Sequence, residues 1–119
     1  VVPTPELLYS IPAVPNLPFD PNGGAFGKTI HIFGRNFIDP VVQIVQLGPD
    51  SGSTIDDTVL NTFHVIAIDD LTSGGVDYQS ITATVGGGIT SSQVGRLRVI
   101  NDNGNAGSVT STLNFLLMP

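Results

Sequence analysis

The chain of 119 residues contains no cysteine and no tryptophan, and its charge is both sparse and unbalanced. Without cysteine there is no disulfide, no thiolate zinc site and no cysteine nucleophile. Charged residues make up 12% of the chain, with a net charge of −6. Nucleic-acid binding needs clustered cations that displace counterions from phosphates. We expect no nucleic-acid partner, because the basic residues are only Lys28, Arg35, Arg96 and Arg98.

Long apolar runs are missing as well, since none approaches the roughly 18 residues of a membrane-spanning helix. We therefore expect no membrane insertion. The apolar fraction of 40% and the length are those of a single folded domain. A surface built from Ser, Thr, Asn, Gln and Gly is typical of extracellular, cell-surface or particle-associated β proteins, which is the location we expect. The chain begins at Val1 and is expected to be a processed product or a piece of a longer protein.

Helical periodicity is absent, whereas alternation with a period of two recurs along the chain. The runs are rich in β-branched residues and are separated by clusters of Gly, Asn and Asp. They span Lys28–Phe33, Val41–Leu47, Thr62–Ile68, Ser80–Val85, Gly95–Ile100 and Ser111–Leu117. Short strands at this spacing predict an immunoglobulin-like antiparallel β-sandwich of about seven strands over residues 25–119.

Residues 1–24 hold six of the nine prolines. Proline fixes φ and removes a hydrogen-bond donor, so this segment is predicted to be an extended arm or linker. Its apolar part, Glu6–Ile11, could supply one short strand. Because the arm is too apolar for a plain solvated linker, it could also lie along the sheet edge of a neighbouring molecule.

The stretch "NGGAFGKTIHIFGRNF", residues 22–37, combines two motifs. Gly-Lys-Thr suggests a phosphate-binding loop, but such a loop needs four residues between its glycines and a following helix. Here three residues separate Gly23 from Gly27, and a strand follows. The first motif is therefore interpreted as a turn.

The second motif, Gly34-Arg35-Asn36-Phe37, resembles the strand-end corner of the IPT/TIG family of immunoglobulin-like domains. The resemblance continues in "FHVIAIDD", "QSITATV" and "GRLRVINDNGNAGSVTSTLNF", and it covers Glu6 to Phe115. The chain departs from the family pattern in its longer proline-rich opening and in the longer acidic loop over residues 48–58. The resemblance implies a sandwich that spaces or presents other parts of a protein.

The corner itself has a physical interpretation independent of the family. Gly34 permits positive φ or a close approach of another segment, and Asn36 can bond the neighbouring backbone. Phe37 can cap the core. We expect Gly34, Asn36 and Phe37 to be structural.

Candidate ligands for a metal or a catalytic centre are few. His31 and His64 have no third partner at a recognisable spacing, so no metal site is predicted from them. No serine lies in a nucleophile elbow, and adjacent aspartates on a strand point to opposite faces. We expect no catalytic residues, no cofactor and no enzyme activity. Hard oxygen donors that could take calcium are Asp102, Asn103 and Asn105 in the last turn, or Asp50, Asp56 and Asp57 in the acidic loop.

Tyr78 is the candidate ligand-binding residue. It lies in "GGVDYQS" and is predicted to be exposed in a loop, where its ring could form a platform for a sugar. The leading functional prediction is a non-catalytic structural or interaction module whose partners are neighbouring domains or other copies. The alternatives are a self-assembling filament, sheath or capsid-decoration subunit that uses the N-terminal arm, and a carbohydrate-binding accessory module.

Overall fold

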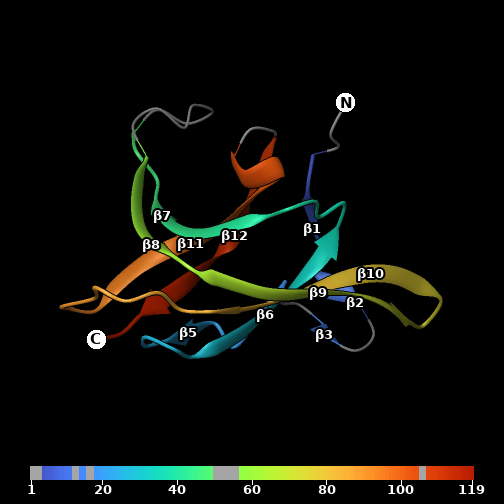
Figure 1. The fold of residues 1–119 in the computed structure, drawn as a ribbon, viewed down its shortest axis with the longest axis horizontal. Coiled ribbons are helices and arrows are strands. Elements are labelled where there is room, and N and C mark those ends of the chain that lie inside the picture. The colour runs from blue at the N-terminus through green and yellow to red at the C-terminus, as the bar shows by residue number, and fades with distance from the viewer. Residues whose placement is uncertain (1–3, 12–13, 16–17, 50–56, 105–106) are drawn as a thin grey trace.

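The computed structural model describes residues 4–11, 14–15, 18–49, 57–104 and 107–119, and these form two packed β-sheets (Figure 1). The first sheet contains β1 (Glu6–Leu7), β4 (Phe19–Asp20), β6 (Thr29–Arg35), β9 (His64–Ser73) and β10 (Val76–Thr84). The second contains β5 (Gly23–Gly24), β7 (Val41–Gln46), β8 (Thr58–Thr62), β11 (Gln93–Ile100) and β12 (Ser108–Leu117). A small hairpin of β2 (Ser10–Ile11) and β3 (Val14–Pro15) and the 3-10 turn η1 (Asp102–Gly104) complete the described elements.

The two sheets form the immunoglobulin-like sandwich that the sequence predicts, and their strand orders agree with it. In the first sheet, β1 and β4 lie on one side of β6, followed by β10 and β9. In the second sheet the order is β5, β12, β11, β7 and β8. These are the A-B-E-D and G-F-C-C′ orders of immunoglobulin domains. The two sheets contain ten strands rather than about seven, because the first strand is divided into β1, β4 and β5 and because β8 follows the acidic loop as an additional strand that the sequence did not predict.

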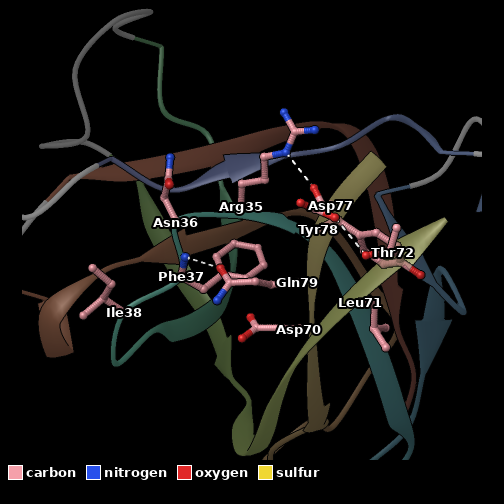
Figure 2. Close-up of a pocket in the computed structure, with 10 residues that line it drawn as sticks. All are labelled: Arg35, Asn36, Phe37, Ile38, Asp70, Leu71, Thr72, Asp77, Tyr78 and Gln79. Atoms are coloured by element: carbon pink, nitrogen blue, oxygen red, sulfur yellow. Dashed lines mark hydrogen bonds between the residues drawn. The ribbon is translucent and has the colours of Figure 1, made fainter. Parts of the chain in front are cut away.

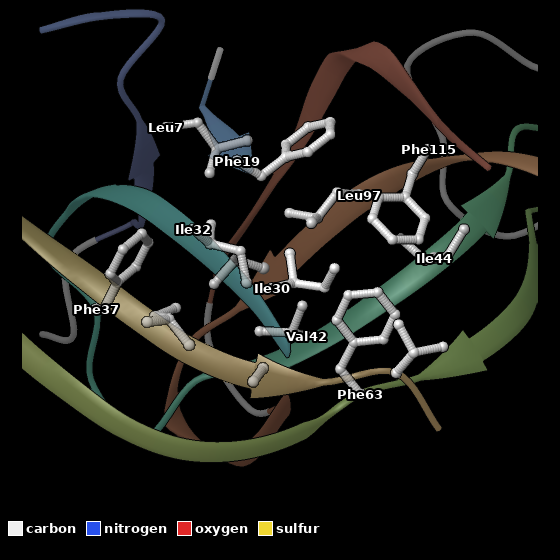
Figure 3. Packing of buried hydrophobic residues seen from close by; sticks show 14 of the residues in the cluster. Leu7, Phe19, Ile30, Ile32, Phe37, Val42, Ile44, Phe63, Leu97 and Phe115 are labelled. Atoms are coloured by element: carbon white, nitrogen blue, oxygen red, sulfur yellow. The ribbon is translucent and has the colours of Figure 1, made fainter. Parts of the chain in front are cut away.

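Alternation along the strands builds the core between the sheets (Figure 3). In β6, Ile30 and Ile32 are fully buried whereas Thr29 and His31 are exposed. Phe115 lies at the centre of an aromatic group, with its ring centroid 5.4 Å from that of Phe63 and 6.0 Å from that of Phe19. Each fully buried side chain of this size contributes roughly 1.5–3 kcal/mol to folding. The buried members of the core are Leu7, Phe19, Ile30, Ile32, Phe37, Val42, Ile44, Phe63, Ile81, Ala83, Val85, Leu97, Val99, Phe115 and Leu117.

The described part of the predicted N-terminal arm belongs to the sandwich. β1 and β4 pair antiparallel with β6, and β5 pairs parallel with β12. Phe19 is 0% exposed, and Leu7 is buried beside it in the same core. Proline does not prevent this arrangement, because its carbonyl still accepts: the Phe33 N–H donates to the Pro18 carbonyl at 2.7 Å. β1 lies within Glu6–Ile11, where the sequence allows a first strand, and the pairing of β4 and β5 shows that residues 18–24 also belong to the sandwich.

Candidate functional site

An open pocket lies between the corner after β6 and the β9–β10 hairpin (Figure 2). Its volume is about 600 Å³, which is within the range of small-ligand sites. It is lined by the end of β6, by the corner after β6, and by facing parts of β9 and β10. The lining residues are Arg35, Asn36, Phe37, Ile38, Asp70, Leu71, Thr72, Asp77, Tyr78 and Gln79.

The hairpin register places polar side chains on the inner face of the first sheet, beyond the end of the core. Asp70 lies opposite Gln79, and Thr72 lies opposite Asp77. Successive side chains alternate between faces, so these four share the face of the buried Ile81. Thr72 Oγ1 donates to Asp77 Oδ1 at 2.8 Å. Among the described residues, the carboxylate of Asp70 has no hydrogen-bond partner, and Figure 2 shows it directed toward Phe37 and Ile38.

The corner after β6 forms the opposite wall of the pocket. A Cβ on Gly34 would overlap the carbonyl oxygen of Glu6 and the ring of Phe37, so a close approach requires glycine here. Asn36 adopts a left-handed conformation with φ of 62°. Phe37 is buried in the core, and its N–H donates to Gln79 Oε1 at 2.7 Å. The corner is thus hydrogen-bonded directly to Gln79 of β10, which lines the pocket.

A buried asparagine that the sequence analysis did not single out ties this corner to the second sheet. Asn101 is 0% exposed, its Oδ1 accepts from the Ile38 N–H at 3.0 Å, and its Nδ2 donates to the Asn36 carbonyl at 2.6 Å. The backbone N–H groups of Asp102 and Asn103 donate to the carbonyls of Ile38 and Asp39. Hydrogen bonds from the end of the second sheet therefore fix the corner that forms this wall of the pocket. The only sequence signal was an asparagine at the end of a strand.

Charge around the pocket is mainly negative. Arg35 is the only one of the four Lys and Arg residues that lines it, and its Nε donates to the Asp77 carbonyl at 3.0 Å. Glu6 lies directly opposite Arg35 in the pairing of β1 with β6. With Asp69, Asp70 and Asp77 nearby on the hairpin, this end of the first sheet carries more carboxylates than cations.

The outer edge of β9 borders the pocket and pairs with none of the described strands, because β9 ends the order of the first sheet (Figure 1). It is ten residues long and exposed almost throughout. Ile66 is 57% exposed, and Ile68 and Leu71 are also exposed on this strand. Alternation in the sequence predicts a strand only to Ile68 and does not reveal the exposed edge. The Gly74-Gly75 pair, with positive φ at both residues, was the available signal for a hairpin that extends the strand to Ser73.

Tyr78 lines the pocket but is not an exposed loop residue. It lies in β10 and is 8% exposed. Its ring packs edge-on against Phe33, with centroids 6.2 Å apart, in a second apolar cluster. The loop prediction was wrong because Val76 already begins the strand, so Tyr78 falls on the covered outer face of the sheet. Its ring offers no open platform.

Of the candidate calcium ligands, Asp102, Asn103 and Asp57 lie in the described part of the chain. Asp102 and Asn103 lie in η1 with positive φ, and Asn105 lies outside the described residues. In the acidic loop, Asp50 and Asp56 also lie outside them, and Asp57 pairs with Arg98 at 2.6 Å. No group of three His, Cys, Asp or Glu side chains able to hold a metal occurs among the residues described. His31 and His64 are both exposed.

The Gly-Lys-Thr motif is the turn that the sequence predicts. Gly27 has φ of 84°, its N–H donates to the Val85 carbonyl, and β6 begins at Thr29.

No family model, curated protein or solved structure matches the chain. Within the described residues, no helix has the length and hydropathy needed to cross a membrane.

Proposed function

We propose that the protein is a non-catalytic interaction module of the IPT/TIG type, which binds a partner protein along the open edge of β9. The observation that carries the proposal is the length of this edge: ten residues of extended backbone with no neighbouring strand in the described structure. An exposed edge presents a row of N–H and C=O groups that another extended segment can satisfy.

Side chains on β9 support the same function. Natural proteins usually protect an edge strand by shortening it, with charged side chains or proline, or with a bulge. β9 carries Asp69 and Asp70 and one register shift in its pairing with β10, but it is ten residues long, has no lysine or proline, and exposes Ile66, Ile68 and Leu71. Exposed aliphatic side chains on both faces of the strand would pack against alternate residues of an added strand.

The two alternative functions have less support. A carbohydrate platform needs an accessible ring, whereas Tyr78 is packed against Phe33. Assembly through an N-terminal arm needs a detachable segment, whereas Leu7 and Phe19 lie in the core of the same chain. The sparse charge and the polar, uncharged composition support an extracellular, surface or particle-associated setting for the module.

A random dodecapeptide library displayed on phage tests the proposal. Peptides selected on the wild-type protein should slow amide hydrogen exchange in β9 when they are added as synthetic peptides. Two single variants, Ile68→Pro and Asp69→Pro, block the edge. Alternate residues direct their N–H groups to opposite edges, so one of the two removes an outward donor while the pairing with β10 stays intact.

The folded member of this pair should bind the selected peptides at least tenfold more weakly. Val94→Lys provides the control, because Val94 is exposed on the second sheet, away from β9. Equal binding to wild type and to the folded proline variant, or protection of amides outside β9, would contradict strand addition.

A further inference from the structure

The pocket beside β9 suggests what kind of segment the edge accepts. We infer that the partner strand carries a lysine or arginine, whose side chain enters this pocket and pairs with Asp70. The inference rests on the proposed function, and it adds the chemistry by which one strand would be preferred over another.

Geometry connects the edge to the pocket through Asp70. This residue lies on β9 itself, and its side chain is on the inner face together with Thr72, Asp77 and Gln79. A residue directly opposite Asp70 on an added strand would project from the same face, with its Cβ roughly 4.5–5.5 Å away. Its side chain would therefore start at the mouth of the pocket.

The pocket has the two features that a long cationic side chain needs. Asp70 supplies a carboxylate without a hydrogen-bond partner among the described residues, at one side of a cavity of about 600 Å³. The exposed Ile38 supplies apolar surface at the other side (Figure 2). Lysine and arginine pack their methylene stems on such surface while the charged end reaches an acid.

Charge argues for a cation over other occupants. Arg35 is the single cation lining the pocket, and Glu6 and Asp77 lie beside it. An anionic ligand would face the two carboxylates of Asp70 and Asp77 against the single guanidinium of Arg35. A neutral sugar would find no open aromatic ring, because Tyr78 and Phe37 are both buried.

Charge also argues against a second copy as the occupant. Asp69 and Asp70 lie near the middle of β9, which spans His64–Ser73. Antiparallel pairing of two β9 strands about a twofold axis would bring both pairs of carboxylates together. Like charges opposite one another destabilise a strand pair, so a basic strand from a different segment fits better.

The test uses the peptides selected on the wild-type protein. We expect lysine or arginine to be enriched at one position, and replacing that residue with norleucine should weaken binding by about three- to tenfold. Asp70→Asn should cause a similar loss, and Asp70→Lys should restore binding to a peptide in which the basic residue is glutamate. Asp69→Asn is the matched control, because it removes the same charge from the opposite face of the same strand.

The outcomes separate this inference from the proposed function. Peptides that protect β9 but show no basic preference, with Asp70→Asn and Asp69→Asn equivalent, would overturn the basic-residue assignment and leave strand addition intact. If no selected peptide protects β9, both fail. A dimer detected by light scattering and lost in the folded proline variant would identify a second copy as the occupant and would overturn the assignment to a basic strand.

Discussion

Single residues hold the ends of strands together, and the clearest case is an ion pair on the second sheet. Arg98 Nη2 lies 2.6 Å from Asp57 Oδ2, and Arg98 Nε donates to Thr110 Oγ1 at 2.8 Å. The other oxygen of Asp57 accepts from the Gly48 N–H at 2.7 Å. The Asp57 side chain is only 4% exposed. The pair thus closes the base of the acidic loop, a role that the sequence analysis did not assign to Asp57.

These contacts make stability depend on pH. The Gly48 N–H and the Arg98 guanidinium hold the pKa of Asp57 below its ordinary value of 3.8, although burial opposes them. A folded-state pKa below the unfolded one gives stability that is complete above the unfolded pKa and is lost as pH falls through the folded pKa. Asp57→Asn should therefore be less stable than wild type at pH 7, and the difference should shrink below about pH 4.

Urea unfolding at pH 7, 5, 4 and 3 measures this difference, with the exposed Asp69→Asn as the control for losing one carboxylate. A gap between wild type and Asp57→Asn that stays constant from pH 7 to pH 3 would assign the loss to packing rather than to the charge.

At the scale of elements, the corner after β6 and the turn η1 act as one unit. Asn101, at the end of β11, bonds both the Ile38 N–H and the Asn36 carbonyl. Asn36, Asp39, Asp102 and Asn103 all have positive φ, which non-glycine residues rarely adopt. Two irregular segments are therefore held against each other, and the pocket wall depends on this contact.

Asn101→Ala tests that dependence. The substitution removes the buried hydrogen bonds to the Ile38 N–H and the Asn36 carbonyl. The unfolding free energy should therefore fall by about 2–4 kcal/mol. Denaturant unfolding gives the value. Asn114→Ala, which removes only an exposed acceptor for Arg96, should change stability by about 0.5 kcal/mol or less. A loss for Asn101→Ala no larger than that of the control would mean that the corner holds without it.

At the scale of elements, period-two alternation predicted the buried strands well but did not predict the exposed edge strand. It identified β6, β10, β11 and β12, because inward residues such as Ile30, Ile81 and Leu97 must be apolar to be buried. It did not identify the full β9, since Asp69 and Asp70 have low strand propensity and nothing forces an exposed edge to alternate. It could not place the pocket either, because Asp70 and Gln79 meet only through the hairpin register.

At the scale of the whole molecule, the question is whether the N-terminal segment is part of the sandwich or a separate arm. The chain passes from the first sheet at β4 to the second sheet at β5. It therefore pairs with β6 in one sheet and with the C-terminal strand β12 in the other. Tyr9 extends the connection, since its hydroxyl oxygen accepts from the Thr112 N–H at 2.9 Å. The density of prolines suggested an arm. Composition does not show that a proline carbonyl, such as that of Pro18, accepts a hydrogen bond from a strand of the sandwich.

Deletion of residues 1–21 should therefore unfold the protein rather than release an arm. The deletion removes the buried Leu7 and Phe19 and uncovers Ile32 and Phe115. Phe19→Ala alone should lower the unfolding free energy by about 3–5 kcal/mol, a large share of the roughly 5–15 kcal/mol of a typical domain. Amide NMR spectra and thermal melts of the two variants measure this.

The exposed Phe26 provides the matched control, since Phe26→Ala should leave the melting temperature nearly unchanged. If the truncated chain kept dispersed spectra and its melting temperature but lost self-association, the segment would act between molecules, and its strands in the sandwich would be dispensable.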